Sequence, residues 1–83
     1  MDYKILFTKM LRARLQEKIK GKIFVSISND DELYVEIDRF GDFTYELSIK
    51  DLSHKLLFGY SVIDAMNEVI QKYRKFVLKK YFR

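Results

Sequence analysis

The sequence predicts a small two-layer α+β domain in which two long helices cover one face of a three-stranded antiparallel sheet. Apolar stripes with a period near 3.6 residues run through both ends of the chain, whereas the middle alternates with a period of two. The three glycines all fall between these stretches, and no proline interrupts them. We expect one domain over residues 1–83, with the element order α-β-β-β-(α)-α.

Residues 3–20 are expected to form the first helix. Apolar residues recur there at i, i+3 and i+4, which places them on one buried stripe. The stripe consists of Tyr3, Leu6, Phe7, Met10, Leu11, Leu15 and Ile19. Gly21 follows, where a left-handed C-terminal cap favours glycine. The polar face carries Lys9, Arg12, Gln16 and Lys20.

The middle of the chain predicts three strands, at residues 22–28, 33–38 and 43–49. Their alternating apolar residues are Ile23, Val25, Ile27, Leu33, Val35, Ile37, Phe43, Tyr45, Leu47 and Ile49. A polar turn at 29–31 and a second turn at 39–42 are short, so the strands are expected to form an antiparallel meander. One face of this sheet would be buried and the other polar.

The rest of the chain predicts a short helix or turn at 51–58 and a long helix from about Val62. Ser61 with Asp64 resembles a capping box at its start. The stripe of the long helix consists of Val62, Met66, Val69, Ile70, Tyr73, Phe76, Val77 and Tyr81. Both long helices should pack on the apolar sheet face around one core. The core should include Phe7, Leu11, Leu15, Val25, Ile27, Val35, Ile37, Leu47, Met66, Ile70 and Tyr73.

Two apolar residues near the C-terminus, Leu78 and Phe82, fall on the polar side of this helix, close to Arg74 and Lys75. Fraying of the helix or cover by a neighbouring element would explain them. They would also form an apolar–basic patch for a partner.

Charge is segregated along the chain. The net charge of +4 combines two basic flanks, residues 1–22 and 52–83, with an acidic middle at residues 29–51. If both helices cover one sheet face, the helical side is basic, and Glu36, Asp38 and Glu46 project from the opposite face. This polarity favours polyanions on one side only. Lysine-rich helices and acidic sheet faces are also ordinary features of solvated surfaces.

No catalytic motif emerges, so we do not expect an enzyme, a metal or a cofactor. His54 is the only histidine, cysteine is absent, and no glycine-rich phosphate loop is present. Glu36 and Glu46 could face each other across two strands, but so small a sheet offers little cleft. The N-terminus lacks a signal-peptide core, and no apolar run approaches a membrane span. We therefore expect a cytoplasmic protein with no membrane contact.

The α-β-β-β-α order is similar to that of double-stranded RNA-binding domains. Those domains carry a lysine cluster at the start of the last helix, where this chain reads Y60-S-V-I-D64. The stretch from Tyr60 to Ile70 also resembles the last helix of bacterial ribosome-hibernation factors. We assign the chain to neither family.

The leading hypothesis is a non-enzymatic binding or regulatory protein that acts on nucleic acid or a nucleoprotein machine through its basic helical face. The residues expected to contact phosphates are Lys9, Arg12, Lys20, Arg74, Lys75 and Lys79. The alternative is a small protein–protein module, such as a phage-type inhibitor or an oligomeric adaptor. It would bind another copy or an acidic protein partner through its C-terminal helix or acidic sheet. Its expected interface residues are Leu78, Phe82, Phe24 and Tyr34.

Overall fold

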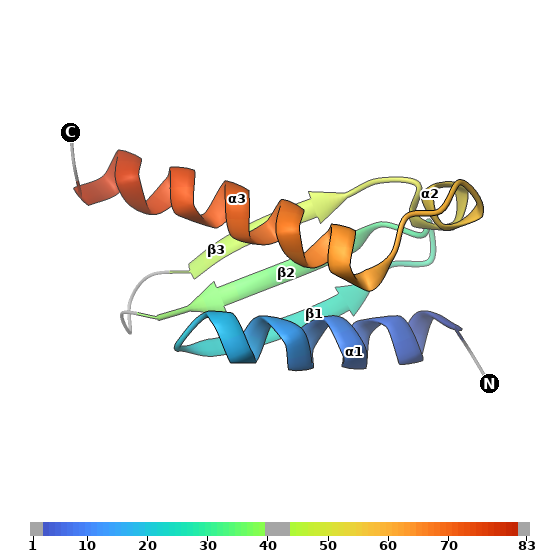
Figure 1. Cartoon of the computed structure of the whole chain (residues 1–83), viewed down its shortest axis with the longest axis horizontal. Coiled ribbons are helices and arrows are strands. Elements are labelled where there is room, and N and C mark those ends of the chain that lie inside the picture. The colour runs from blue at the N-terminus through green and yellow to red at the C-terminus, as the bar shows by residue number, and fades with distance from the viewer. Residues whose placement is uncertain (1–2, 40–43, 82–83) are drawn as a thin grey trace.

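The computed structural model describes residues 3–39 and 44–81 and confirms the expected α+β fold (Figure 1). The elements follow in the order α1 (Tyr3–Lys18), β1 (Lys22–Ile27), β2 (Leu33–Asp38), β3 (Thr44–Ile49), α2 (Leu52–Leu57) and α3 (Val62–Tyr81). The strands form one antiparallel sheet in the order β1-β2-β3. No helix in the described part of the chain is long and apolar enough to cross a membrane.

The strand register gathers the alternating apolar residues on one face of the sheet. Val35 in the central strand pairs with Val25 on one side and Leu47 on the other, and the rows above and below are equally apolar. Both long helices contribute to the single core that covers this face. Its buried helical residues are Phe7, Leu11 and Leu15 from α1, Leu52 from α2, and Ala65, Val69 and Tyr73 from α3.

The buried stripes are narrower than the sequence pattern predicts. The buried residues of α1 follow one i, i+4, i+8 line: Phe7, Leu11 and Leu15. Tyr3, Leu6 and Met10 lie on the flank of the helix beside that line and are exposed. Tyr81 was expected in the core but is 52% exposed, because the last turns of α3 reach past the start of β3 (Figure 1). Four expected core residues are half-buried at the margin of the core: Val25, Ile27, Met66 and Ile70.

The opposite face of the sheet has no described element over it. Glu36 pairs with Glu46 across β2 and β3, as the alternation predicts. Phe24 lies on the same face and is 54% exposed. Like charges directly opposite each other destabilise a strand pair slightly, but they also discourage stacking of a second sheet.

Gly21 is required where α1 turns into β1. Its φ of +137° lies in the region that favours glycine, and a Cβ there would lie 2.8 Å from the Asp38 carbonyl oxygen. The close approach of this turn to the end of β2 thus depends on the missing side chain.

Both long helices run in the same direction, from the end of the molecule that carries α2 towards the other end (Figure 1). Their N-termini therefore lie beside the acidic turn between β1 and β2, and their C-termini lie at the opposite end. Carboxylates near helix N-termini and lysines near helix C-termini both interact favourably with the helix dipoles. The charge segregation in the sequence thus becomes a polarity along the 40 Å long axis as well as across the two layers.

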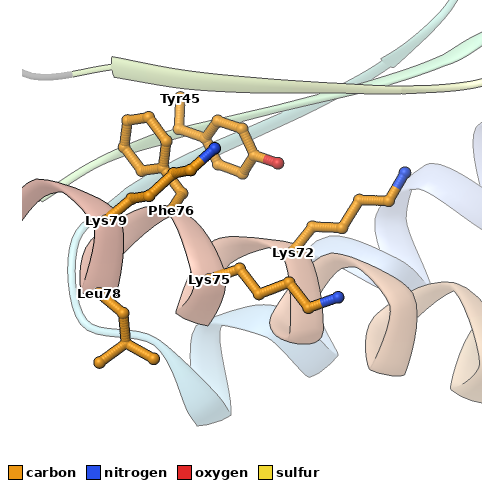
Figure 2. Close-up of a pocket in the computed structure, with 6 residues that line it drawn as sticks. All are labelled: Tyr45, Lys72, Lys75, Phe76, Leu78 and Lys79. Atoms are coloured by element: carbon orange, nitrogen blue, oxygen red, sulfur yellow. The ribbon is translucent and has the colours of Figure 1, made fainter.

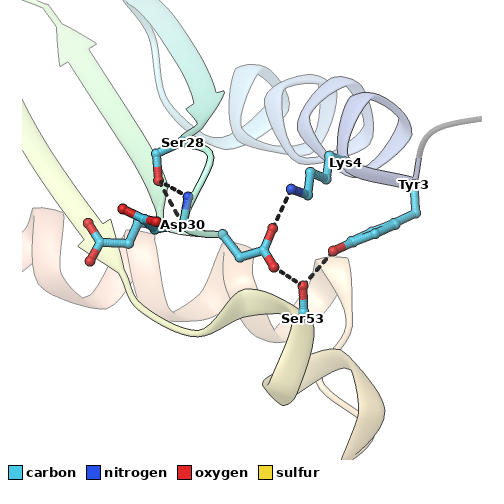
Figure 3. A network of polar contacts seen from close by, with 7 residues as sticks. Tyr3, Lys4, Ser28, Asp30 and Ser53 are labelled. Carbon is cyan, nitrogen blue, oxygen red and sulfur yellow. Dashed lines mark hydrogen bonds and ion pairs between the residues drawn. The ribbon is translucent and has the colours of Figure 1, made fainter.

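A polar network fastens three elements at the acidic end (Figure 3). Lys4 of α1 forms an ion pair of 2.5 Å with Asp31 in the β1–β2 turn, and Ser53 of α2 donates a hydrogen bond to the same carboxylate. Tyr3 in turn bonds to the Ser53 hydroxyl at 2.5 Å. The hydrogen bonds from Lys4 and Ser53 lower the pKa of Asp31 below its ordinary value.

Candidate functional site

An open groove of about 630 Å³ lies between β3 and the C-terminal half of α3 (Figure 2). We call it the lysine groove, and it is lined by Tyr45, Lys72, Lys75, Phe76, Leu78 and Lys79. Positions 72, 75, 76 and 79 follow the i, i+3, i+4, i+7 spacing, so they share one flank of α3. Tyr45 faces that flank from the inner side of β3.

The floor of the lysine groove is aromatic. The Tyr45 and Phe76 rings stack with their centroids 4.6 Å apart and their planes within 6°. Tyr73 lies 6.3 Å from the same Tyr45 ring, so three rings fill the space between β3 and α3. Burial of the Tyr45 phenol raises its pKa. The Tyr45–Phe76 stack thus joins β3 to α3 at the groove.

The rim of the lysine groove is cationic. Lys72, Lys75 and Lys79 are exposed, and Figure 2 shows Lys79 extending across the two stacked rings. Residues 69–81 contain five basic residues and no acidic one: Lys72, Arg74, Lys75, Lys79 and Lys80. Leu78 points away from the sheet in Figure 2 and is 55% exposed, as its position off the helical stripe predicts. The groove thus combines an apolar floor with several cations.

The six predicted phosphate contacts are divided between the two long helices. Lys75 and Lys79 line the groove beside β3, and Arg74 is exposed on the same helix. The other three lie on or just after α1, whose sheet contact is β1 at the opposite edge: Lys9, Arg12 and Lys20. The basic helical side therefore extends over both long helices, which contact each other, with α1 over β1 and the C-terminal half of α3 beside β3.

The predicted partner-interface residues are also divided. Phe24 and Tyr34 lie on the open face of the sheet, whereas Leu78 lies on α3 in the helical layer. The Tyr34 hydroxyl donates a 2.5 Å hydrogen bond to Glu32, which raises the pKa of the tyrosine. Phe82 lies outside the residues that the structure describes.

The sequence interpretation missed Lys72, Tyr45 and Phe76 as lining residues of a surface site. The helical spacing of residues 72, 75 and 79 was a readable signal of one basic flank. Tyr45 and Phe76 were expected to be core, and both are half-buried, so their exposed edges could be found only from the tertiary packing.

A second exposed apolar feature occupies the other end of the molecule. Leu57 and Phe58, which we call the α2 tip, are 83% and 78% exposed. His54 packs against Phe58 with ring centroids 4.8 Å apart, which gives the one histidine a surface position. A shallow hollow of about 560 Å³ beside Phe58 is also lined by Lys55, Tyr60 and Asp64.

Tyr60 anchors the chain behind the α2 tip. Its hydroxyl donates a 2.9 Å hydrogen bond to Glu68, and Lys55 lies 5.4 Å from the centre of its ring. Burial, together with the bond to Glu68, raises the pKa of Tyr60 strongly. No group of three metal-ligating side chains occurs among residues 3–39 and 44–81.

Comparisons with protein-family models, with curated proteins and with solved structures found no match for this chain.

Proposed function

We propose that this protein is a non-enzymatic binding protein that acts on nucleic acid or a nucleoprotein assembly through the lysine groove and the surrounding basic surface of α3. The observation that carries the proposal is the run of five basic and no acidic residues at 69–81, three of which surround one groove. The carboxylates of the open sheet face lie on the other layer, so a polyanion is attracted to the helical side.

Lysines that contact phosphates supply affinity without reading the sequence. Lys72, Lys75 and Lys79 are single point charges on flexible stems, which suits a backbone of variable geometry. Three such contacts to duplex DNA correspond to a slope of about −2.7 in a plot of log affinity against log salt. Affinity should then fall about 40-fold between 50 and 200 mM salt.

The test is fluorescence anisotropy with labelled duplex and single-stranded oligonucleotides over that salt range. Lys75→Glu with Lys79→Glu should weaken binding strongly, and the slope of the remaining binding should become shallower. The matched control, Lys9→Glu with Arg12→Glu, changes net charge equally but lies on α1. Equal loss from both double variants would show that only net charge matters, and no binding by the unmodified protein at 50 mM salt would rule the proposal out.

A second candidate function, a protein–protein module, is favoured by the apolar floor of the groove and by exposed Leu78. A phage-type inhibitor or adaptor would use this surface to bind an acidic protein. Purification from cells separates the two candidates. A high ratio of absorbance at 260 to 280 nm supports nucleic acid, whereas a stoichiometric protein band that Leu78→Ser abolishes supports the module.

A further inference from the structure

The α2 tip is an apolar projection with a firm base. Leu57 and Phe58 are the most exposed large apolar side chains in the described part of the chain. The backbone N–H groups of Phe58 and Gly59 bond to carbonyls of α2 at 3.1 and 3.2 Å. Leu52 at the base of α2 is buried, and its N–H donates to the Asp31 carbonyl at 3.0 Å. Two adjacent exposed apolar side chains on an ordered support are typical of a contact surface.

Carboxylates accompany the α2 tip. Asp51 precedes α2 directly, Asp64 lines the same hollow as Phe58, and Asp30 lies in the neighbouring β1–β2 turn. All three side chains are exposed. The nearby cations are Lys50, which precedes Asp51, and Lys55, which lines the same hollow as Phe58. Carboxylates therefore outnumber lysines around the apolar tip, by three to two, whereas the charged residues that line the lysine groove are all cations.

The two surfaces lie towards opposite ends of the molecule. Figure 1 shows α2 at one end of the 40 Å long axis and the C-terminal turns of α3 at the other. A second copy displaced along this axis would bring its α2 tip near the lysine groove of the first. Each surface would then meet one of opposite charge and similar apolar character.

We propose that the α2 tip of one copy docks in the lysine groove of a second copy. Leu57 and Phe58 would cover the Tyr45–Phe76 floor, and the acidic neighbours of the tip would face the lysine rim. Because the second copy is displaced along the long axis, each contact leaves one tip and one groove free, so the contact is heterologous and builds open chains or closed rings. So small a contact belongs with weak, transient interfaces, so assembly depends on protein concentration.

This inference is independent of the proposed function, although both use the lysine groove. Self-association is therefore measured on protein freed of nucleic acid by nuclease treatment and a high-salt wash, then returned to about 150 mM salt, near physiological ionic strength. Failure to assemble would leave nucleic-acid binding unaffected, and failure to bind oligonucleotides would leave assembly unaffected.

The experiment is sedimentation velocity on two half-interface variants and on their mixture. The tip variant carries Leu57→Ser with Phe58→Ser, and the groove variant carries Lys75→Glu, Leu78→Ser and Lys79→Glu. The unmodified protein should show a mass that rises with concentration beyond the dimer. Each variant alone should be monomeric, because it retains only one half of the contact. An equimolar mixture should associate again and stop at the dimer, because one intact tip meets one intact groove.

Circular dichroism melts establish that both variants fold, which the exposure of the substituted side chains leads us to expect. A monomeric unmodified protein at high concentration would overturn the proposal. So would a mixture that stays monomeric. A groove variant that still forms dimers while the tip variant does not would show instead that two tips pair with each other.

Discussion

Replacing Val35 by alanine should destabilise the protein more than the same change at Val25 in the same row of the sheet. Val35 is 0% exposed in the central strand, whereas Val25 on the edge strand β1 is half-buried. Removing two buried methyl groups costs about 1.6 kcal/mol in transfer free energy, and a residual cavity between Val25 and Leu47 raises the loss to about 2–3 kcal/mol. For a domain of this size that loss corresponds to a fall of about 10–20 °C in Tm.

Urea unfolding followed by circular dichroism measures both variants at equal ionic strength. We expect Val25→Ala to cost roughly half as much as Val35→Ala, because part of its side chain is already in water. The slope of free energy against urea should stay the same for both, since neither change alters the surface exposed on unfolding. A loss below about 0.5 kcal/mol for Val35→Ala, or a larger loss for Val25→Ala, would refute the assignment of the sheet faces.

Three further changes test local features. Asp31→Asn removes a carboxylate whose pKa is lowered on folding. In thermal melts, the unmodified protein should lose stability as the pH falls from about 4 towards the folded pKa. The variant should lack that part of the loss. Tyr60→Phe removes a phenol whose pKa is raised by burial and by Glu68. Because the phenol ionises first in the unfolded chain, the stability of the unmodified protein should fall above pH ~10, and that of the variant should fall less steeply. The same dependence of Tm on pH in both proteins would contradict this. Gly21→Ala places a Cβ against the Asp38 carbonyl oxygen at a φ of +137°. The free energy of unfolding in urea should fall by about 1–3 kcal/mol. An unchanged urea midpoint would show that the turn adjusts to the added Cβ without strain.

Periodicity alone was enough to predict the order of the elements and the inner face of the sheet. Alternation places Val35 and Leu47 on one side of any strand that they form, and the register confirms it. Helical spacing likewise predicts Phe7, Leu11 and Leu15 on one line, and all three are buried. These features depend on neighbours within a few positions, so the local sequence determines them.

The candidate site was predictable only in part. Lys75 and Lys79 were identified from charge and helical position, and both line the groove. Their position relative to Lys9 could not be predicted, because the placement of α1 over β1 and of α3 beside β3 depends on how the layers pack.

The apolar features of both proposed surfaces were decided by the tertiary structure. A helical wheel cannot show that Tyr45 of β3 stacks on Phe76 of α3, since these residues are distant in sequence and meet only when the layers close. Nor does the composition of α2 show that Leu57 and Phe58 project into water while Leu52 is buried. Side-chain chemistry and spacing are local properties of the chain. Exposure is a property of the whole molecule, because it depends on which other element covers each face.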